Sequence, residues 1–564
     1  MPLACDIDRK KTRVRGILNL LSILLVCLFC VSLFKHISYP LFWNDEGNTA
    51  MFGVRVLEYG FPKVHDGKNI VYESSVSMKT GVYKKWDAFL AGSWLTYYFA
   101  AVGVFFAELV EDVYWKTAII RFFFACAGFL GLALLAWSLA GLFQSGSVSR
   151  ALFIAAFVFF GLISVSLVLH LREVRHYPLM VFLSACVIRV YMDFHVFKRT
   201  SFTKYAVLLV ALLFLAFHAF YPLYFIFLAS MAIFERFSSF KKSVFWKHAL
   251  VLLGSLVTAL PFIYFFRIRE ISLILSERCG FGWGRYWENL VFLAGFFAKH
   301  EFLYLALFVK AAQVLLRYIH SSEAGEPAED ARQKLRMSDF MSLFFIVHLL
   351  AAARTPWVFT RYVIVLQPVL TAILLLDVFL IFYFLNHLVS PDSIAKFKKG
   401  LVLLLVLGFG LNSRHKLEPL AGHVHELLYP YKGPLDFAIP YILENHKDTG
   451  KLVIAANYEE NSLMYYLGAK VIIGFVKNNL EEDLKETPDV MIFRKYWERD
   501  PRELRTFLGK AGYRKILFPV LDYPVNNMPD LHHGIRHLFH TPLAKNESDR
   551  LEIYVKDREV TSDK

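Results

Sequence analysis

Two adjacent carboxylates, Asp45 and Glu46, follow the first long apolar run of this chain, where such a run would meet water. A carboxylate in that place can act as a general base, hold a cation or cap a helix. The stretch WNDEGNTAMFGVRVLEYG allows a helix that is capped by Asn44 or Asp45 and ends at Gly60. A base would need an acceptor hydroxyl within hydrogen-bond reach and shielding from water.

Positively charged side chains stand near the ends of several other apolar runs. Arg gives bidentate contacts to phosphate and Lys acts as a point charge, so a group of them suits a phosphate. Taken singly, each is more simply an interfacial charge that reaches toward water. The candidates for binding phosphate are Lys84, Lys85, Arg172, Arg175, Arg354 and Arg361. A carboxylate beside such cations at a lipid boundary would fit a lipid-phosphate substrate.

The histidines give less specific signals. His218, beside Tyr221, would either contact a substrate or satisfy a buried polar need. The stretches HVHE at 423–426 and LHHGIRH at 531–537 lack an established metal-ligand spacing with a second partner group. Solvated surface histidines are therefore expected there, and no metal site is predicted.

The composition is that of an integral membrane protein with many spans. Of the 564 residues, 56% are hydrophobic and 55 are Phe, and the mean hydropathy is +0.44. The net charge of +14 comes from Lys and Arg scattered among short loops, which indicates orientation in a bilayer and not a nucleic-acid partner. Five of the six Cys lie in the N-terminal third, which argues against a disulfide framework and a thiolate metal site.

Apolar runs long enough to cross a bilayer, or nearly so, predict about eleven spans. The 205–234 run is interrupted by FHAFYP and is expected to form two short helices that meet at residues 218–222. The 88–110 run carries Trp and Tyr suited to the headgroup level and is expected to lie in the interface instead of crossing. The remaining runs are 17–34, 119–143, 151–169, 177–194, 248–266, 290–309, 339–353, 362–386 and 400–413.

The sidedness of the loops follows from their positive charge. With 88–110 in the interface, the N-terminus and the loops on its side hold 21 Lys and Arg, whereas the opposite short loops hold 8. Cytoplasmic loops carry the excess of Lys and Arg, so the N-terminal side is expected to be cytoplasmic. The Asp45–Glu46 loop, the C-terminal region and the loops at 171–178, 218–222, 267–289 and 354–362 would then share the other face.

The polar region from 415 to 564 is expected to be a separate soluble α/β domain. Short apolar runs predict strands at 451–456, 470–475, 489–494 and 515–520. The stretches EENSLMYYLG (459–468) and PRELRTFLGKAG (501–512) predict helices between them. No Gly-rich phosphate motif precedes these helices, so nucleotide binding is unsupported.

Three segments of the chain resemble one family. WNDEGNTAMFGVRVLEYGF is similar to the Asp-Glu signature in the first outer loop of GT-C glycosyltransferases of the protein mannosyltransferase and aminoarabinose (lipid A) transferase type. LREVRHYPLMVFLSA followed by LAFHAFYPLYFIFLA resembles their Arg-x-Tyr and His segments, and FTRYVIVLQPVL resembles their Arg-Tyr…Pro segment. The likeness covers most of residues 17–386 in order and spacing. Asn48 stands where members commonly have Arg, and GVYKKWDAF lacks their Pro-Pro pair.

The resemblance implies a GT-C fold with a transmembrane catalytic domain at 1–414, whose first outer loop is 35–118. It implies catalysis on the extracytoplasmic face with a polyprenyl-phosphate sugar as donor, Asp45 as the base and Glu46 as the accompanying acid. It adds Tyr177 and Tyr362 to His218 as candidate substrate contacts. The reaction would be an inverting displacement that requires no cofactor, and a divalent metal near Asp45 and Glu46 is left open.

The acceptor would be lipid A, another envelope glycan or a protein. A bacterial inner membrane with the site facing the periplasm is favoured over an endoplasmic reticulum, because the tail holds one evident glycosylation sequon, at Asn546, and no retention signal. The main alternative is a transporter or flippase of a lipid-linked or anionic solute, although no internal repeat is evident. A third alternative is a catalytically idle membrane scaffold.

Overall fold

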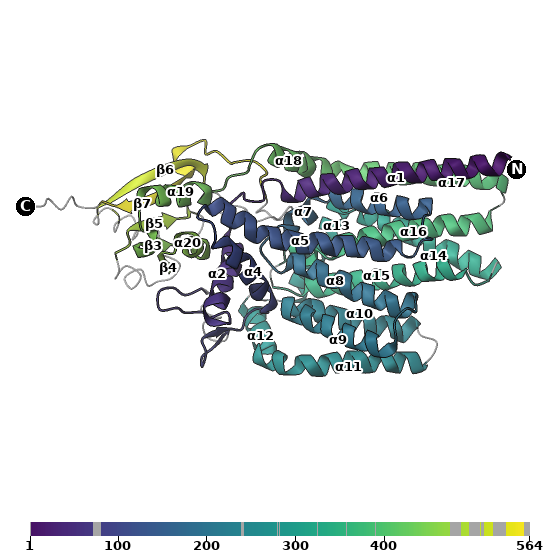
Figure 1. The fold of residues 1–564 in the computed structure, drawn as a ribbon, viewed down its shortest axis with the longest axis horizontal. Coiled ribbons are helices and arrows are strands. Elements are labelled where there is room, and N and C mark those ends of the chain that lie inside the picture. The colour runs from purple at the N-terminus through teal and green to yellow at the C-terminus, as the bar shows by residue number, and fades with distance from the viewer. Residues whose placement is uncertain are drawn as a thin grey trace, which may run out of the picture.

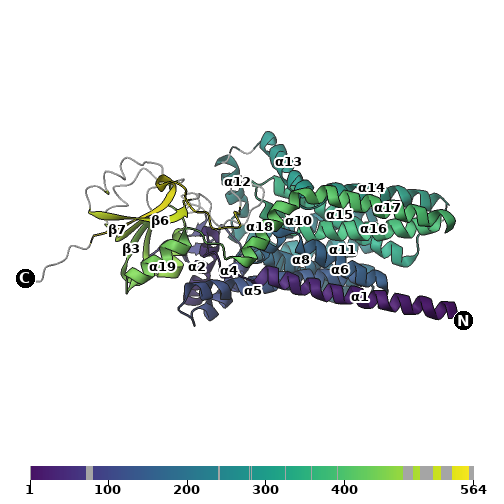
Figure 2. The same cartoon turned by 90° about the horizontal axis from the view of Figure 1, so that it is seen from above.

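The protein consists of a long bundle of helices with a smaller sheet-containing region at one end (Figure 1). The computed structural model describes residues 2–71, 81–238, 242–278, 280, 282–323, 325–356, 358–389, 391–473, 487–495, 508, 512–522 and 537–557. The first helix begins at the end of the bundle that is far from the sheet, and the view turned by 90° in Figure 2 shows the same arrangement.

Eight helices among the described residues are long and apolar enough to cross a membrane. A helix satisfies its own backbone N–H and C=O groups, which a bilayer interior requires. The eight are α1 (Pro2–Phe34), α5 (Val113–Ala140), α8 (Tyr177–Tyr191) with its π-helical extension η1 (Met192–Val196), α9 (Phe202–Ala219), α11 (Lys242–Phe265), α14 (Leu303–Glu323), α15 (Glu329–Ala353) and α16 (Leu366–Leu388). The prediction of a polytopic helical membrane protein is confirmed.

The described residues hold fewer candidate spans than the predicted number of about eleven, because the second half of the 205–234 run and the run at 400–413 are not among them and one further run is bent. The run at 151–169 forms α6 (Val148–Leu162) and α7 (Val165–Leu171), which are bent by 78° and raise the number to nine if they are counted as one span. The run at 290–309 is divided between α13 (Trp283–His300) and α14.

The two breaks meet at a buried polar cluster. Ser164, between α6 and α7, donates a hydrogen bond of 2.7 Å to the carboxylate of Glu301, which lies between α13 and α14. Lys416 approaches the other carboxylate oxygen of Glu301 at 3.5 Å. Broken helices are tolerated in a membrane protein where the freed polar groups are buried within protein and find partners there. Single-sequence hydropathy does not detect such a long-range partnership.

The FHAFYP interruption separates two helices that meet within 218–222, as predicted, although each is longer than the short helices expected. Helices α9 and α10 (Tyr221–Ser238) have 18 residues each and pack against each other. Phe220 is extended between them. Pro222 lies in the first turn of α10, where its missing N–H breaks no helical hydrogen bond.

The first outer loop contributes elements that lie between the bundle and the sheet. Helices α2 (Asn44–Tyr59) and α4 (Leu95–Ala107) run across the long axis of the bundle (Figure 1). The 13 residues of α4 are too few for a hydrocarbon core of about 30 Å at roughly 1.5 Å per residue, in agreement with the prediction for 88–110. A small antiparallel hairpin, β1 (Val82–Tyr83) and β2 (Ala88–Phe89), lies between these helices in the sequence.

The C-terminal region contains a five-stranded mixed sheet with the strand order β4-β3-β5-β7-β6. Strands β3 (Val453–Ala456), β4 (Lys470–Ile473), β5 (Val490–Phe493) and β6 (Tyr513–Leu521) confirm the four predicted strands, and helix α20 (Glu460–Leu467) confirms the first predicted helix. Strand β7 (Arg550–Lys556) was not predicted, although RLEIYVK alternates as a strand does. The helix predicted at 501–512 lies almost wholly outside the described residues.

The remaining described elements connect helices of the bundle, lead from the bundle to the sheet or lie within the sheet region. They are α12 (Ile268–Arg278), η2 (Thr360–Val363), α17 (Pro391–Ser413), η3 (Arg414–Lys416), α18 (Leu417–Leu428), α19 (Leu435–Asn445), η4 (Thr449–Lys451) and η6 (Glu547–Asp549). The predicted span at 400–413 lies in α17, whose apolar stretch Val402–Leu411 is short.

One hydrophobic core joins the sheet to the first outer loop. Ile454 and Ile492 point from one face of the sheet into a cluster that also contains Phe52 and Val104 of α2 and α4. Their neighbour Met491 packs on the other face, as the two-residue period of a strand requires. The C-terminal region therefore packs as a continuation of the outer loop, while the proposed boundary between 414 and 415 stays a prediction.

Candidate active site

Asp45 lies in the first turn of α2, and its carboxylate faces two guanidinium groups. The Oδ2 atom of Asp45 is 3.5 Å from Nη2 of Arg175 and 3.8 Å from Nη2 of Arg361. The residue at the helix N-cap is Trp43, without a side-chain cap hydrogen bond, so the expected cap by Asn44 or Asp45 is wrong. The predicted helix end is confirmed, because Gly60 adopts the left-handed conformation with φ of 81°.

Two loops at the outer ends of the bundle position the arginines. Arg175 lies between α7 and α8, and its Nη1 also approaches the backbone oxygen of Asp45 at 3.4 Å. Arg361 lies in η2, with 4% of its side chain exposed, over the rings of Trp43 at 5.0 Å and Phe359 at 4.2 Å. Its Nε and Nη1 atoms are buried without a hydrogen-bond partner among the described residues. Donors of this kind are available to an anionic ligand.

Asp45 and Arg175 line an open, mainly polar cavity of about 370 Å³. Its walls come from α2, from the segment that leads into α4, from the α7–α8 and α9–α10 connections and from α20. The lining residues are Asn44, Asp45, Asn48, Thr49, Phe89, Ala91, Gly92, Ser93, Thr96, Tyr97, Arg175, His176, Ala219, Phe220, Tyr221 and Asn461. Many of these carry amide or hydroxyl groups, which suit a hydroxylated ligand.

Glu46 points away from this cavity into the protein. Its two oxygens accept hydrogen bonds from Arg121, at 2.9 Å from Nε and 2.5 Å from Nη2, and one oxygen also accepts from the backbone N–H of Val174 at 3.0 Å. Removing one partner of a buried ion pair of this kind costs about 3–5 kcal/mol. The geometry gives Glu46 the role of fixing α2 to α5 and to the loop that carries Arg175.

Arg172 is also bound elsewhere. Its Nη2 lies 2.5 Å from a carboxylate oxygen of Glu426 in α18, and His537 contacts the other oxygen at 3.1 Å. His423 shares this buried site and forms a hydrogen bond of 2.7 Å with Ser32 of α1. His423 and His537 are therefore buried, contrary to the expectation of solvated histidines. Arg172 and His537 attract Glu426 and hold its pKa well below the ordinary value, despite burial.

Of the other predicted site residues, Tyr177 and Tyr362 lie close enough to Arg175 and Arg361 to interact with both electrostatically. Tyr177 is buried beside the rings of His170 and His176, and Tyr362 follows Arg361 in η2. His218 packs among Phe rings, including that of Phe262. None of these three is among the described residues that line the Asp45 cavity. Lys84, Lys85 and Arg354 are exposed, and they too are absent from that lining.

Two residues that sequence reasoning missed lie in the loop of Arg175. His176 lines the cavity and stacks on Phe220 with ring centroids 4.5 Å apart. Burial and the two neighbouring arginines lower the pKa of His176 well below its usual range, so the imidazole is neutral at pH 7. Burial raises the pKa of Glu173 to about 8, despite the attraction of Arg361. The signal available in the sequence was the position of Glu173 and His176 within LREVRHYP, next to Arg172 and Arg175.

The residues around Asp45 and Glu46 do not suit a divalent cation. Asp45 faces Arg175 and Arg361, and Glu46 is held by Arg121. No group of three or more His, Cys, Asp and Glu side chains placed to hold a metal occurs in the part of the chain that the structure describes. We therefore derive no step through a metal ion.

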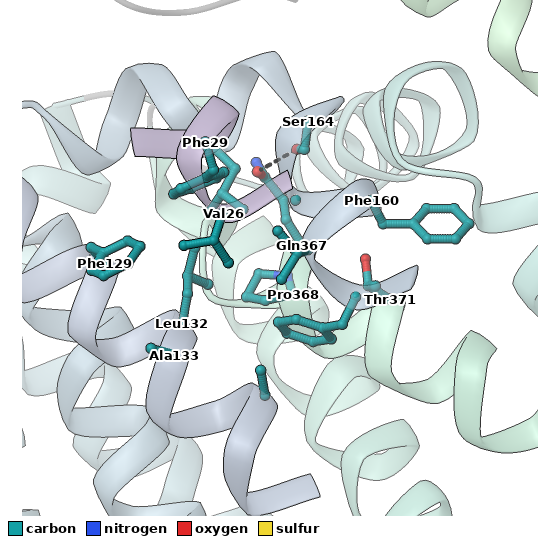
Figure 3. Close-up of a pocket in the computed structure, with 15 residues that line it drawn as sticks. Val26, Phe29, Phe129, Leu132, Ala133, Phe160, Ser164, Gln367, Pro368 and Thr371 are labelled. Atoms are coloured by element: carbon teal, nitrogen blue, oxygen red, sulfur yellow. Dashed lines mark hydrogen bonds between the residues drawn. The ribbon is translucent and has the colours of Figure 1, made fainter. Parts of the chain in front are cut away.

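A second, smaller cavity, of about 70 Å³, lies among the membrane helices (Figure 3). Figure 3 shows Phe29, Phe129 and Phe160 around it, and the hydrogen bond of 3.2 Å that Ser164 donates to Gln367. Its walls come from α1, α5, α6, α7 and α16, and its lining is largely apolar. This cavity suits hydrocarbon, whereas the Asp45 cavity suits polar groups.

The fold and the site together define a polytopic membrane protein with a polar cavity, containing a carboxylate and flanking arginines, between its helix bundle and its sheet region. No protein-family model matches the chain, and no curated protein matches it.

Two solved structures are similar along nearly the whole chain. One is ArnT from Cupriavidus metallidurans in the apo state, with a TM-score of 0.48 and 13% identity. The other is ArnT from the same organism bound to undecaprenyl phosphate, with a TM-score of 0.49 and 12% identity. Each match covers 96% of this chain and 98% of the other chain. Likeness at this level carries no argument about the reaction, which has to be inferred from the residues of this chain.

Proposed function

We propose that this protein is a membrane glycosyltransferase of the GT-C type. It would transfer a sugar from a polyprenyl-phosphate donor to a hydroxyl of lipid A, another envelope glycan or a protein on the extracytoplasmic face. The observation that carries the proposal is the placement of Asp45 in a polar cavity beside Arg175 and Arg361, at the end of the membrane bundle. This arrangement offers a base and two phosphate-binding groups at a lipid boundary.

The two arginines would hold the donor phosphate. A guanidinium binds phosphate with paired, charge-assisted hydrogen bonds, and Arg361 has buried N–H groups without described partners. The Asp45 contacts of 3.5 and 3.8 Å are longer than direct hydrogen bonds. A phosphate between the arginines would compete with Asp45 for them and leave its carboxylate available to the acceptor.

The reaction would be a single displacement with inversion at the anomeric carbon. The acceptor oxygen forms a bond to this carbon while the bond between the carbon and the phosphate oxygen breaks. Asp45 accepts the acceptor proton, and the departing polyprenyl phosphate keeps the bonding electron pair. Arg175 and Arg361 stabilise the negative charge that develops on the leaving oxygen. His176 is neutral and provides a polar cavity wall without adding a third positive charge.

The experiment that tests the proposal compares purified wild-type protein with Asp45→Asn in transfer from polyprenyl-phosphate sugars to candidate acceptors. Loss of a general base reduces the rate by at least about 100-fold, while binding of polyprenyl phosphate is retained because both arginines remain. Asp448→Asn is the matched control, since Asp448 is exposed in the C-terminal region and pairs with Lys451. Unchanged transfer by Asp45→Asn would refute the assignment of Asp45 as base.

A further inference from the structure

Helix α20 of the C-terminal region reaches the cavity that contains Asp45. Asn461, in the first turn of α20, lines this cavity although only 4% of the residue is exposed. Its amide nitrogen donates to Oδ1 of Asn44 at 3.3 Å and to Oε1 of Glu460 at 3.1 Å. The hydrogen bond to Asn44 joins positions that are 417 residues apart in the chain and places α20 beside the candidate base.

The position of Asn461 is fixed by the packing of α20 on α2. A Cβ atom at Gly47 would lie only 2.6 Å from the backbone nitrogen of Ser462, so the two helices are in backbone contact. Tyr466 adds two hydrogen bonds through its hydroxyl group, which accepts from the N–H of Phe42 at 3.1 Å and lies 2.5 Å from the hydroxyl of Thr117. A side chain held in this way can select a ligand geometrically.

The chemistry of the cavity wall around Asn461 suits an uncharged, hydroxylated ligand. Amide groups come from Asn44, Asn48 and Asn461, and hydroxyl groups come from Ser93 and Thr96. Among the described lining residues, Asp45 is the one carboxylate, and it already faces two arginines. The nearby carboxylate of Glu460 is not part of this lining and already accepts a hydrogen bond from Asn461. A positively charged amino sugar would thus meet guanidinium groups with no lining carboxylate other than Asp45, whereas sugar hydroxyls can both donate to and accept from the amides.

We propose that Asn461 is a specificity-determining residue of the C-terminal region that hydrogen-bonds the hydroxyls of an uncharged donor sugar. This inference rests on the proposed glycosyltransferase function of the same site. It assigns the sheet region a direct part in substrate selection: α20 supplies one wall of the sugar subsite while the bundle loops supply Arg175 and Arg361 for the phosphate.

The test is a binding measurement on the purified full-length protein, which needs no acceptor. The probes are bare polyprenyl phosphate and a panel of the same lipid carrying uncharged hexoses or pentoses, or an amino sugar. Wild-type protein binds at least one uncharged sugar lipid about tenfold more tightly than bare polyprenyl phosphate. Asn461→Ala loses about tenfold of this preference, as expected for one hydrogen bond in a buried site, and leaves binding of the bare lipid unchanged. Asn461→Asp shifts the preference toward the amino sugar.

Asn445→Ala is the matched control, because Asn445 is exposed on α19 and its amide donates a hydrogen bond to the backbone oxygen of Tyr441 in the same helix. The assignment of Asn461 is overturned if wild type, Asn461→Ala and Asn461→Asp show the same preference for an uncharged sugar. It is also overturned if wild-type protein prefers the amino sugar. If wild-type protein binds neither bare nor sugar-bearing polyprenyl phosphate, the proposed function itself is overturned. A merely structural role of Asn461 would lower the binding of bare and sugar-bearing lipid alike.

Discussion

Neighbouring residues in the first turn of α2 face different surroundings, because successive side chains of a helix are rotated by about 100°. Asp45 lines the polar cavity, whereas Glu46 is only 2% exposed and forms a buried pair with Arg121. The same division applies to Arg172 and Arg175, of which only Arg175 faces Asp45. In both pairs one residue lines the cavity, and the other forms a buried ion pair that holds its segment in place.

Arg354 and Arg361, which flank residues 355–360, allow a prediction at the scale of a single residue. Arg361→Gln is expected to weaken binding of polyprenyl phosphate at least about tenfold, because a charge-assisted hydrogen bond contributes about 1.5–3 kcal/mol. Arg354→Gln is the matched control and is expected to bind normally, since Arg354 is exposed, whereas Arg361 is buried and faces Asp45. Binding is measured by titration of the purified proteins with polyprenyl phosphate.

Because Arg361 is buried, its variants need a check of folding. Arg361→Lys keeps the charge but not the paired donor geometry, so it is expected to fall between wild type and Arg361→Gln. Thermal unfolding in detergent identifies variants that fail to fold. Equal phosphate affinity in folded Arg361→Gln, Arg354→Gln and wild-type protein would show that Arg361 does not hold the phosphate.

At the scale of elements, the site depends on close contact between helices that are distant in sequence. Helices α2 and α20 approach each other at Gly47 and Ser462, and one hydrophobic core continues from α2 and α4 to the sheet. Glycine allows this approach because it has no Cβ atom. The geometry of the cavity is thus set jointly by the outer loop and the C-terminal region.

Gly47→Ala is expected to displace α20 and to lower both thermal stability and the preference for sugar-bearing lipid. The added Cβ would lie 2.6 Å from the nitrogen and 2.9 Å from the Cα of Ser462, and backbone atoms cannot move aside as a side chain can. Overpacking of this kind costs about 1–3 kcal/mol. Gly254→Ala is the control, because a Cβ at Gly254 in α11 meets nothing within 4 Å. Equal unfolding midpoints for the two variants would contradict this account.

The sequence predicted the elements whose causes are local. Long apolar runs predicted the membrane helices, and short apolar runs predicted β3, β4, β5 and β6. The loop charges and family resemblance singled out Asp45, Arg175 and Arg361, which the structure brings together. The partner of each residue was not predictable from the sequence. Arg172 and Glu46 carry the same charges as Arg175 and Asp45 and lie close to them in the chain, yet they form buried ion pairs.

The features that were missed depend on long-range contacts. The broken spans meet where Ser164 contacts Glu301, 137 positions away, and Asn461 joins Asn44 across 417 positions. Neither pairing leaves a periodic signal in a single sequence, since periodicity reports which face of an element is buried and not which partner covers it.

At the scale of the whole molecule, the site and the C-terminal region lie at one end, and the first helix begins at the other (Figure 1). The excess of Lys and Arg in the loops on the N-terminal side predicts that this side faces the cytoplasm. A cysteine in place of the exposed Lys447 is therefore expected to react with a membrane-impermeant maleimide in intact cells. A cysteine in place of the exposed Glu326, between α14 and α15, is expected to react only after permeabilisation. Both variants are made in a protein whose six native Cys are replaced by Ser, and this cysteine-free protein is the unlabelled control. The reverse pattern would place the Asp45 cavity in the cytoplasm and exclude an extracytoplasmic reaction.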